Sequence, residues 1–159
     1  MLALRGYSGM ITIPVLISIR SNAHREEAVE DETMTMLTAG TLELTETEAV
    51  IRYEEQIDES VPMQQVTVTV GENGATMTRE GAYTTHMVFR MGCRYEGQYR
   101  TPYGEMDLAV YCTRLAYDLG DDGGALEISY QLDLNGRFAA MHDMELRVMV
   151  QGSDDESDE

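Results

Sequence analysis

The chain has 159 residues, enough for one well-buried core and too few for two full domains. Its 29 acidic residues outnumber 11 lysine and arginine residues, all of them arginine, which gives a net charge of −18. Such an acidic surface repels phosphate backbones and anionic headgroups, which argues against nucleic acid and membrane surfaces as partners.

The first apolar segment, Met10–Ile19, has two interpretations. Its length and flanking residues imitate the core of a signal peptide, but its isoleucine and valine side chains alternate as in a strand, and Arg20 follows at once. It is too short to cross a bilayer as a helix. We therefore predict a strand, with residues 1–9 as a disordered leader and Met1 or Met10 as the start. Two cysteines make no disulfide framework, which favours a cytoplasmic location.

Alternation of apolar and polar residues dominates the rest of the chain and predicts strands. The predicted strands after the first are 33–44, 48–56, 63–70, 75–80, 84–91, 105–115, 125–134 and 137–150. Gly40 is predicted to form a bulge or bend. The polar segment 21–32 is predicted to be a loop and 118–124 a turn, whereas the glycine-containing segment 92–99 has no clear pattern.

Two Asn-Gly pairs, at 73–74 and 135–136, predict tight hairpins because both residue types tolerate positive φ angles. About eight to ten strands joined by short turns form a meander, and closing it removes the exposed edges. The sequence therefore predicts an all-β fold, a single closed or nearly closed antiparallel β-barrel over residues 10–150. The acidic segment 151–159 is predicted to be a disordered tail.

The turn Thr101–Gly104 determines the register of the two cysteines. Its proline fixes φ at the first corner, and Gly104 suits the left-handed position that closes a three-residue loop. In that register Cys93 lies opposite Thr113 and the two thiols point to opposite faces, which predicts no disulfide. A two-residue loop would instead place Cys93 opposite Cys112.

Five short pieces of the sequence carry a family resemblance. They are Ala39–Leu42, Ile51–Glu55, Thr78–Gly81, Thr101–Met106 and Ile128–Leu132. In order and spacing these pieces resemble the YwiB-like family of uncharacterised bacterial proteins, over roughly residues 11–150, and Thr101–Met106 is the most specific of them. The resemblance implies a calycin-like (lipocalin-like) β-barrel, and it implies no activity, cofactor or site residue.

The candidate site residues are Tyr53, Glu55, Arg79, Arg90 and Tyr103. Tyr53 and Glu55 share one face of a predicted strand. If that face lies inside the barrel, the carboxylate needs a cationic partner, which either Arg79 or Arg90 could supply. Such a pair would anchor the polar head of a ligand or fix the register of the barrel; the alternative places these acids in solvent on the outer face. Tyr103, at a hairpin tip, could contact a ligand at the rim.

No motif pairs a nucleophile with a base, so we expect neither an enzyme nor a cofactor. The three histidines lack the spacing of metal ligands, so no metal site is predicted. The 12 methionines suit either an adaptable apolar pocket or a gap-filled core. The first functional hypothesis is therefore a barrel that binds a small, largely apolar molecule in its lumen. The alternative is a structural or protein-interaction barrel with a filled interior.

Overall fold

The computed structural model describes residues 2–25, 30–56 and 59–150. The predicted acidic tail, 151–159, lies outside the described residues. Over the described ranges, no helix has the length and apolar character that crossing a membrane requires.

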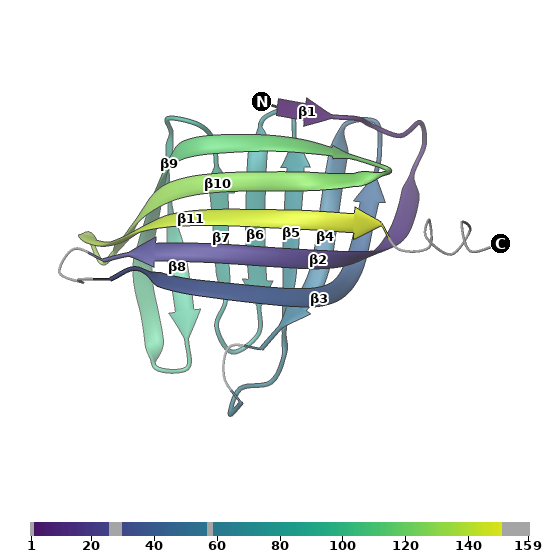
Figure 1. Cartoon of the computed structure of the whole chain (residues 1–159). Helices are drawn as coiled ribbons and strands as arrows, with labels where there is room; N and C mark the ends of the chain where they lie inside the picture. The colour runs from purple at the N-terminus through teal and green to yellow at the C-terminus, as the bar shows by residue number, and fades with distance from the viewer. Residues whose placement is uncertain (1, 26–29, 57–58, 151–159) are drawn as a thin grey trace.

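Eleven strands follow one another along the described chain (Figure 1). They are β1 (Leu2–Leu4), β2 (Ile11–His24), β3 (Glu32–Leu44), β4 (Glu48–Glu55), β5 (Gln64–Gly71), β6 (Gly74–Glu80), β7 (Thr85–Phe89), β8 (Arg94–Thr101), β9 (Gly104–Gly120), β10 (Gly123–Leu134) and β11 (Arg137–Val150). Hydrogen bonds connect them in the order β1-β9-β10-β11-β2-β3-β4-β5-β6-β7, and β8 pairs with β9 beside this path. The β1–β9 pairing is parallel, and the other strand pairings are antiparallel.

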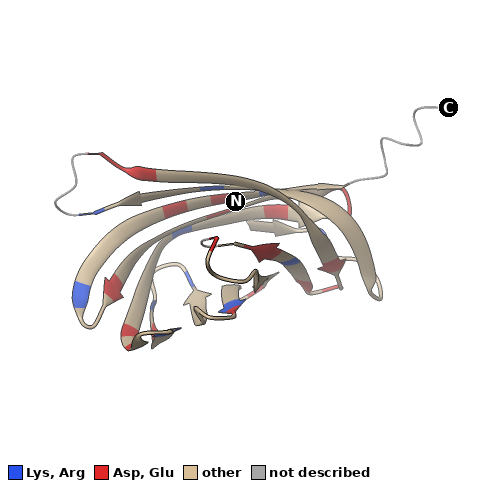
Figure 2. Cartoon of the chain, turned by 90° about the horizontal axis from the view of Figure 1, so that it is seen from below, with Lys and Arg blue, Asp and Glu red and all other residues tan. Residues whose placement is uncertain are grey.

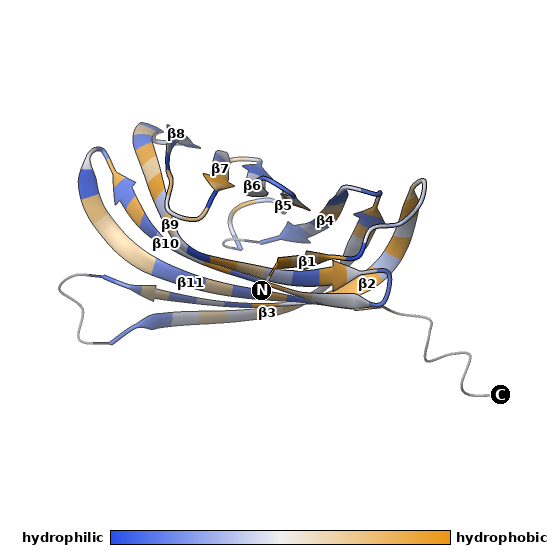
Figure 3. Ribbon diagram, turned by 90° about the horizontal axis from the view of Figure 1, so that it is seen from above, coloured by the Kyte–Doolittle hydropathy of each residue, from blue (hydrophilic) through white to orange (hydrophobic). Residues whose placement is uncertain are grey.

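The sheet curls strongly on itself. In Figure 1, β9, β10, β11, β2 and β3 cross the front while β4 to β8 run behind them at a steep angle, and Figure 3 shows the curl from above. At the seam between β7 and β8, Thr84 and Arg100 exchange two backbone hydrogen bonds of 2.9 Å. The prediction of an all-β, closed or nearly closed barrel is confirmed in its nearly closed form, because the hydrogen-bonded strand order is open and ends at β1 and β7.

The core forms from the inward faces that alternation predicts. Val15, Ile17 and Ile19 of β2 are 0–3% exposed, and Leu126 and Ile128 of β10 are equally buried. Acidic positions occur on strands of both layers, with the basic positions more sparsely distributed among them (Figure 2). The sheet thus keeps an apolar interior beneath an acidic exterior.

Alternation along the predicted strand 137–150 places Phe138 on the same inward face as Ala140 and Leu146, but Phe138 is 39% exposed. The register of β10 and β11 shifts here, because Leu132 pairs with Ala140 whereas Asp133 pairs with Phe138. The extra residue, Ala139, reverses the direction of the side chains before it. The placement of Phe138 on the inward face was therefore wrong.

The start of the chain also differs from the prediction. Residues 2–4, assigned to a disordered leader, form β1 beside β9. Arg5, which follows, makes ion pairs with Asp118 and Asp122. The predicted turn at 118–124 is shorter than expected, because β9 continues to Gly120 and β10 begins at Gly123.

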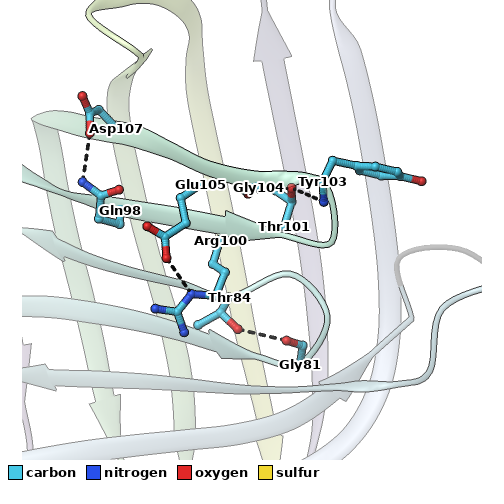
Figure 4. Close-up of polar contacts among 9 residues, drawn as sticks. All are labelled: Gly81, Thr84, Gln98, Arg100, Thr101, Tyr103, Gly104, Glu105 and Asp107. Carbon is cyan, nitrogen blue, oxygen red and sulfur yellow. Dashed lines mark hydrogen bonds and ion pairs between the residues drawn. The ribbon is translucent and has the colours of Figure 1, made fainter.

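The β8–β9 turn has two residues, not the predicted three, because Thr101 pairs with Gly104. Figure 4 shows the reason: the Thr101 hydroxyl accepts the Tyr103 N–H at 3.0 Å and itself donates to the Gly104 carbonyl at 2.9 Å. Cys93 therefore lies opposite Cys112, whose N–H donates to the Cys93 carbonyl at 3.2 Å. Both thiols are free, with that of Cys93 exposed and that of Cys112 buried.

Candidate functional site

The inward residues of the back strands change character along the barrel. Three rows run across β4, β5, β6 and β7, each formed by residues that pair directly with their neighbours. The first row is Ala49, Val70, Ala75 and Phe89; the second is Ile51, Val68, Met77 and Met87; the third is Tyr53, Val66, Arg79 and Thr85. The first two rows are buried and apolar. Polar groups thus enter the interior at the third row, near one end of the barrel.

A cavity of about 360 Å³ lies at this end. Its wall includes apolar side chains from both layers, together with the polar side chains of the third row. The tyrosines in the wall are Tyr53, Tyr83, Tyr99 and Tyr130, and the methionines are Met34, Met36, Met87 and Met144. Long side chains with sulfur or aromatic rings give an apolar wall that can adjust to a ligand.

An ion pair lies in the wall of this cavity. The Arg79 Nε donates to a Glu55 carboxylate oxygen at 2.7 Å, and the side chains are 26% and 11% exposed, respectively. The two residues come from β4 and β6, with β5 between them. A carboxylate with so little exposure requires a partner, and Arg79 provides it.

Several hydrogen-bond donors around this pair have no protein partner among the described residues. The buried Thr85 hydroxyl has none, although the residue is only 7% exposed and lines the cavity. The terminal nitrogens of Arg79 and the hydroxyls of Tyr53 and Tyr130 likewise make no hydrogen bond within the described ranges. Buried hydroxyls and guanidinium groups normally find acceptors. The cavity therefore presents donors that lack acceptors.

Burial favours the neutral forms of Tyr53, Tyr130 and His142 in this wall. It raises the pKa of the Tyr53 phenol to about 12 and also raises that of Tyr130, while the charge of Arg79 opposes both shifts. His142 stacks on Tyr130 with ring centres 5.0 Å apart. Burial lowers the pKa of His142, and the charges of Arg25 and Arg79 lower it further. At neutral pH, the two phenols are donors and this imidazole is uncharged.

Three of the five predicted site residues meet in this wall. Tyr53 and Glu55 point into the barrel, and Arg79, not Arg90, supplies the cationic partner. Glu54, next to them, points outward and accepts a hydrogen bond from Gln65. The alternative placement of Glu55 on the outer face was therefore wrong.

The other two predicted residues lie away from the cavity. Arg90 is exposed, and its Nε donates to the Asn73 carbonyl at 3.1 Å, at the opposite end of β6 from Arg79. Tyr103 is 91% exposed and projects from the β8–β9 turn (Figure 4). Arg90 fails as a partner of Glu55 because it lies beyond the first, fully apolar row.

Sequence reasoning did not select Thr85, Tyr130 or His142. Tyr130 and His142 alternate with mostly aliphatic residues along the predicted strands 125–134 and 137–150. Their polar atoms on these otherwise apolar faces could have marked them as site residues. Thr85 gave no such signal, because threonine occurs on both faces of the strands. For metal binding, no group of three His, Cys, Asp or Glu side chains in the described part of the chain is arranged to hold an ion.

The Tyr53 phenol predicts a dependence of stability on alkaline pH. Between its ordinary pKa of 10.0 and about 12, the unfolded chain loses a proton that the folded protein keeps, so the free energy of unfolding falls as pH rises. At about pH 11 this group should remove on the order of 1 kcal/mol, and Tyr53→Phe should abolish that part of the slope. Urea denaturation followed by circular dichroism from about pH 8 to pH 11 measures both slopes. Equal slopes in the two proteins would contradict the assignment.

Comparison with known proteins identifies the family. The model described as Domain of unknown function (DUF1934) matches residues 17–146. Among solved structures, the crystal structure of ywiB protein from Bacillus subtilis has a similar fold, with a TM-score of 0.78 and 21% sequence identity, covering 89% of this chain and 95% of that chain. The search among curated proteins gives no match. The sequence resemblance to YwiB-like proteins is thereby confirmed, and the chain belongs to the DUF1934 family.

Proposed function

We propose that this protein is a calycin-like binding protein that holds one small, largely apolar molecule in the lumen of its barrel. The observation that carries the proposal is the cavity of about 360 Å³ beside the Glu55–Arg79 pair. Pockets that hold small ligands commonly measure about 300–1,000 Å³ and combine an apolar wall with a few polar groups. The wall described above has this composition.

The half-packed interior supports binding over the filled barrel. Where the apolar rows cross the back strands, side chains such as Val68 and Phe89 are 0% exposed and fill the space between the layers. At the third row the packing ends and the cavity begins. A barrel with a purely structural interior would gain stability from continuing the apolar packing to this end.

The proposal extends to the setting in which the protein works. It is a binder and not a catalyst, acts in the cytoplasm, and has neither nucleic acid nor membrane as a partner. The free thiols of Cys93 and Cys112 support a reducing compartment. The net charge of −18 supports the exclusion of polyanionic partners.

A fluorescent probe tests the proposal. Anilinonaphthalene sulfonate, which brightens in apolar sites, is expected to bind the native protein with one-to-one stoichiometry. Ser21 lines the cavity, so Ser21→Phe should fill part of it and weaken binding at least about tenfold. Ser18 lies three residues earlier in β2, on its outer face, and Ser18→Phe is the matched control. Absence of binding to the wild-type protein, or equal weakening by both variants, would contradict a lumen site.

A further inference from the structure

We infer that the lumen recognises a carboxylate on its apolar ligand, bound by the free donors of Arg79 together with the hydroxyls of Tyr53, Tyr130 and Thr85. This inference rests on the proposed function and specifies the polar end of the ligand. It is carried by the excess of donors over acceptors in the wall of the cavity.

The donors around Arg79 outnumber the acceptors. A guanidinium offers N–H groups on three nitrogens and accepts nothing. Glu55 engages only the Nε of Arg79, so both terminal nitrogens keep their N–H groups. The Thr85 hydroxyl is buried without a partner, and the phenols of Tyr53 and Tyr130 have none within the described residues. The Glu55 carboxylate has about four acceptor sites, one of which is taken by the Arg79 Nε, and those left cannot satisfy four terminal N–H groups and three hydroxyls.

These donors converge on one place in the barrel. Tyr53, Arg79 and Thr85 lie in the same cross-strand row, with Arg79 directly paired to Thr85. Tyr130 comes from β10, in the other layer, and the Arg79 charge acts on both Tyr53 and Tyr130. All of them line the one cavity. Three strands of the back layer and one of the front layer thus direct donors into a shared space.

The donors favour one kind of ligand head group over the others. An ammonium group could pair only with Glu55, which Arg79 already neutralises, and it would face the Arg79 cation and hydroxyl donors, so it is the least favoured head group. A hydroxyl can accept from one or two of the donors and leaves the others without a partner. The two oxygens of a carboxylate are coplanar and spaced to accept from two N–H groups of a guanidinium at once. They can also accept hydrogen bonds from hydroxyls. Glu55 holds the Nε side of Arg79 and so acts as a positioning residue for this contact.

Three probes that differ only in their polar group test the inference. Naphthoate, naphthalenemethanol and naphthylmethylamine share an aromatic body that suits the tyrosine and methionine side chains of the wall. Isothermal titration calorimetry at neutral pH is expected to give naphthoate at least about tenfold tighter binding than the alcohol, and the amine the weakest binding.

Variants assign the preference to Arg79. The double variant Glu55→Gln with Arg79→Met avoids an unpaired buried charge and should bind naphthoate and the alcohol equally. Tyr53→Phe should weaken naphthoate binding severalfold and leave the alcohol nearly unchanged. Arg90→Met, which removes an exposed arginine away from the cavity, should keep the wild-type preference.

The outcomes separate the inference from the proposed function. Equal binding of naphthoate and the alcohol to the wild-type protein, or an intact preference in the double variant, would overturn the carboxylate site and leave a binding barrel. Failure of all three probes and of anilinonaphthalene sulfonate to bind would overturn the proposed function itself.

Discussion

Replacing Arg79 with methionine is expected to lower the free energy of unfolding by about 3 kcal/mol. Glu55 is only 8% exposed, and the substitution leaves its carboxylate without a cationic partner inside the barrel. Removing one partner of a buried pair typically costs about 3–5 kcal/mol, and the 26% exposure of the Arg79 side chain places the effect at the lower end. Urea denaturation followed by circular dichroism measures the change, since the chain has no tryptophan.

Two controls show whether the loss comes from the buried charge. Adding Glu55→Gln to Arg79→Met removes the unpaired carboxylate and should recover most of the lost stability, to within about 1 kcal/mol of the wild-type protein. Arg52 makes a comparable ion pair with Glu43 at 3.0 Å on the outer face, where Arg52→Met should cost less than about 1 kcal/mol. If the single and double variants at the cavity were equally unstable, the pair would not be acting as described.

Replacing Gly40 with alanine is expected to destabilise the protein by about 3 kcal/mol. Gly40 lies in β3 where this strand pairs with β2 on one side and β4 on the other. A Cβ atom here would clash with the backbone oxygen of Arg52 and would lie 2.6 Å from the Ile17 Cδ1 and 3.2 Å from the Tyr53 Cβ. Because one of these neighbours is backbone, the strands themselves would have to separate. The same shift would displace Tyr53 in the cavity wall and weaken binding of anilinonaphthalene sulfonate.

Gly71 of β5 provides the matched control for this substitution. A Cβ atom there would lie 3.5 Å from the nearest atoms of Glu48 and Thr47, which is ordinary van der Waals contact. Gly71→Ala should therefore change the free energy of unfolding by less than about 1 kcal/mol. Similar losses from the two substitutions would refute the role of Gly40 as the point of close approach between β2, β3 and β4.

The fold could be predicted because alternation in the strands is strong and local. The predicted bounds of β11 agree with the structure at both ends, and those of β3, β4 and β6 agree to within one residue at each end. Errors arose where the pairing register decides which residues face each other, because register is a property of two strands and not of either sequence. Phe138 is such a case, as is the two-residue loop that places Cys93 opposite Cys112.

The site could be predicted only in part, for a related reason. The pairing of Tyr53 and Glu55 on one face followed from their spacing, and the need for an arginine followed from the cost of burying a carboxylate. The choice between Arg79 and Arg90 depends on which end of the barrel each lies near. Arg79 lies at the end with the cavity and Arg90 at the end with the apolar rows, and the spacing of apolar residues does not reveal this difference. The cavity itself depends on side chains from both layers.

Native mass spectrometry of the protein purified without detergent, set against its denatured mass, tests the central claim most directly. A barrel that holds a molecule in its lumen is expected to show a discrete non-covalent adduct that disappears on denaturation and is absent from Ser21→Phe. A native mass without an adduct, both before and after naphthoate and anilinonaphthalene sulfonate are added, would contradict a binding barrel. That result would favour a barrel that acts through its surface.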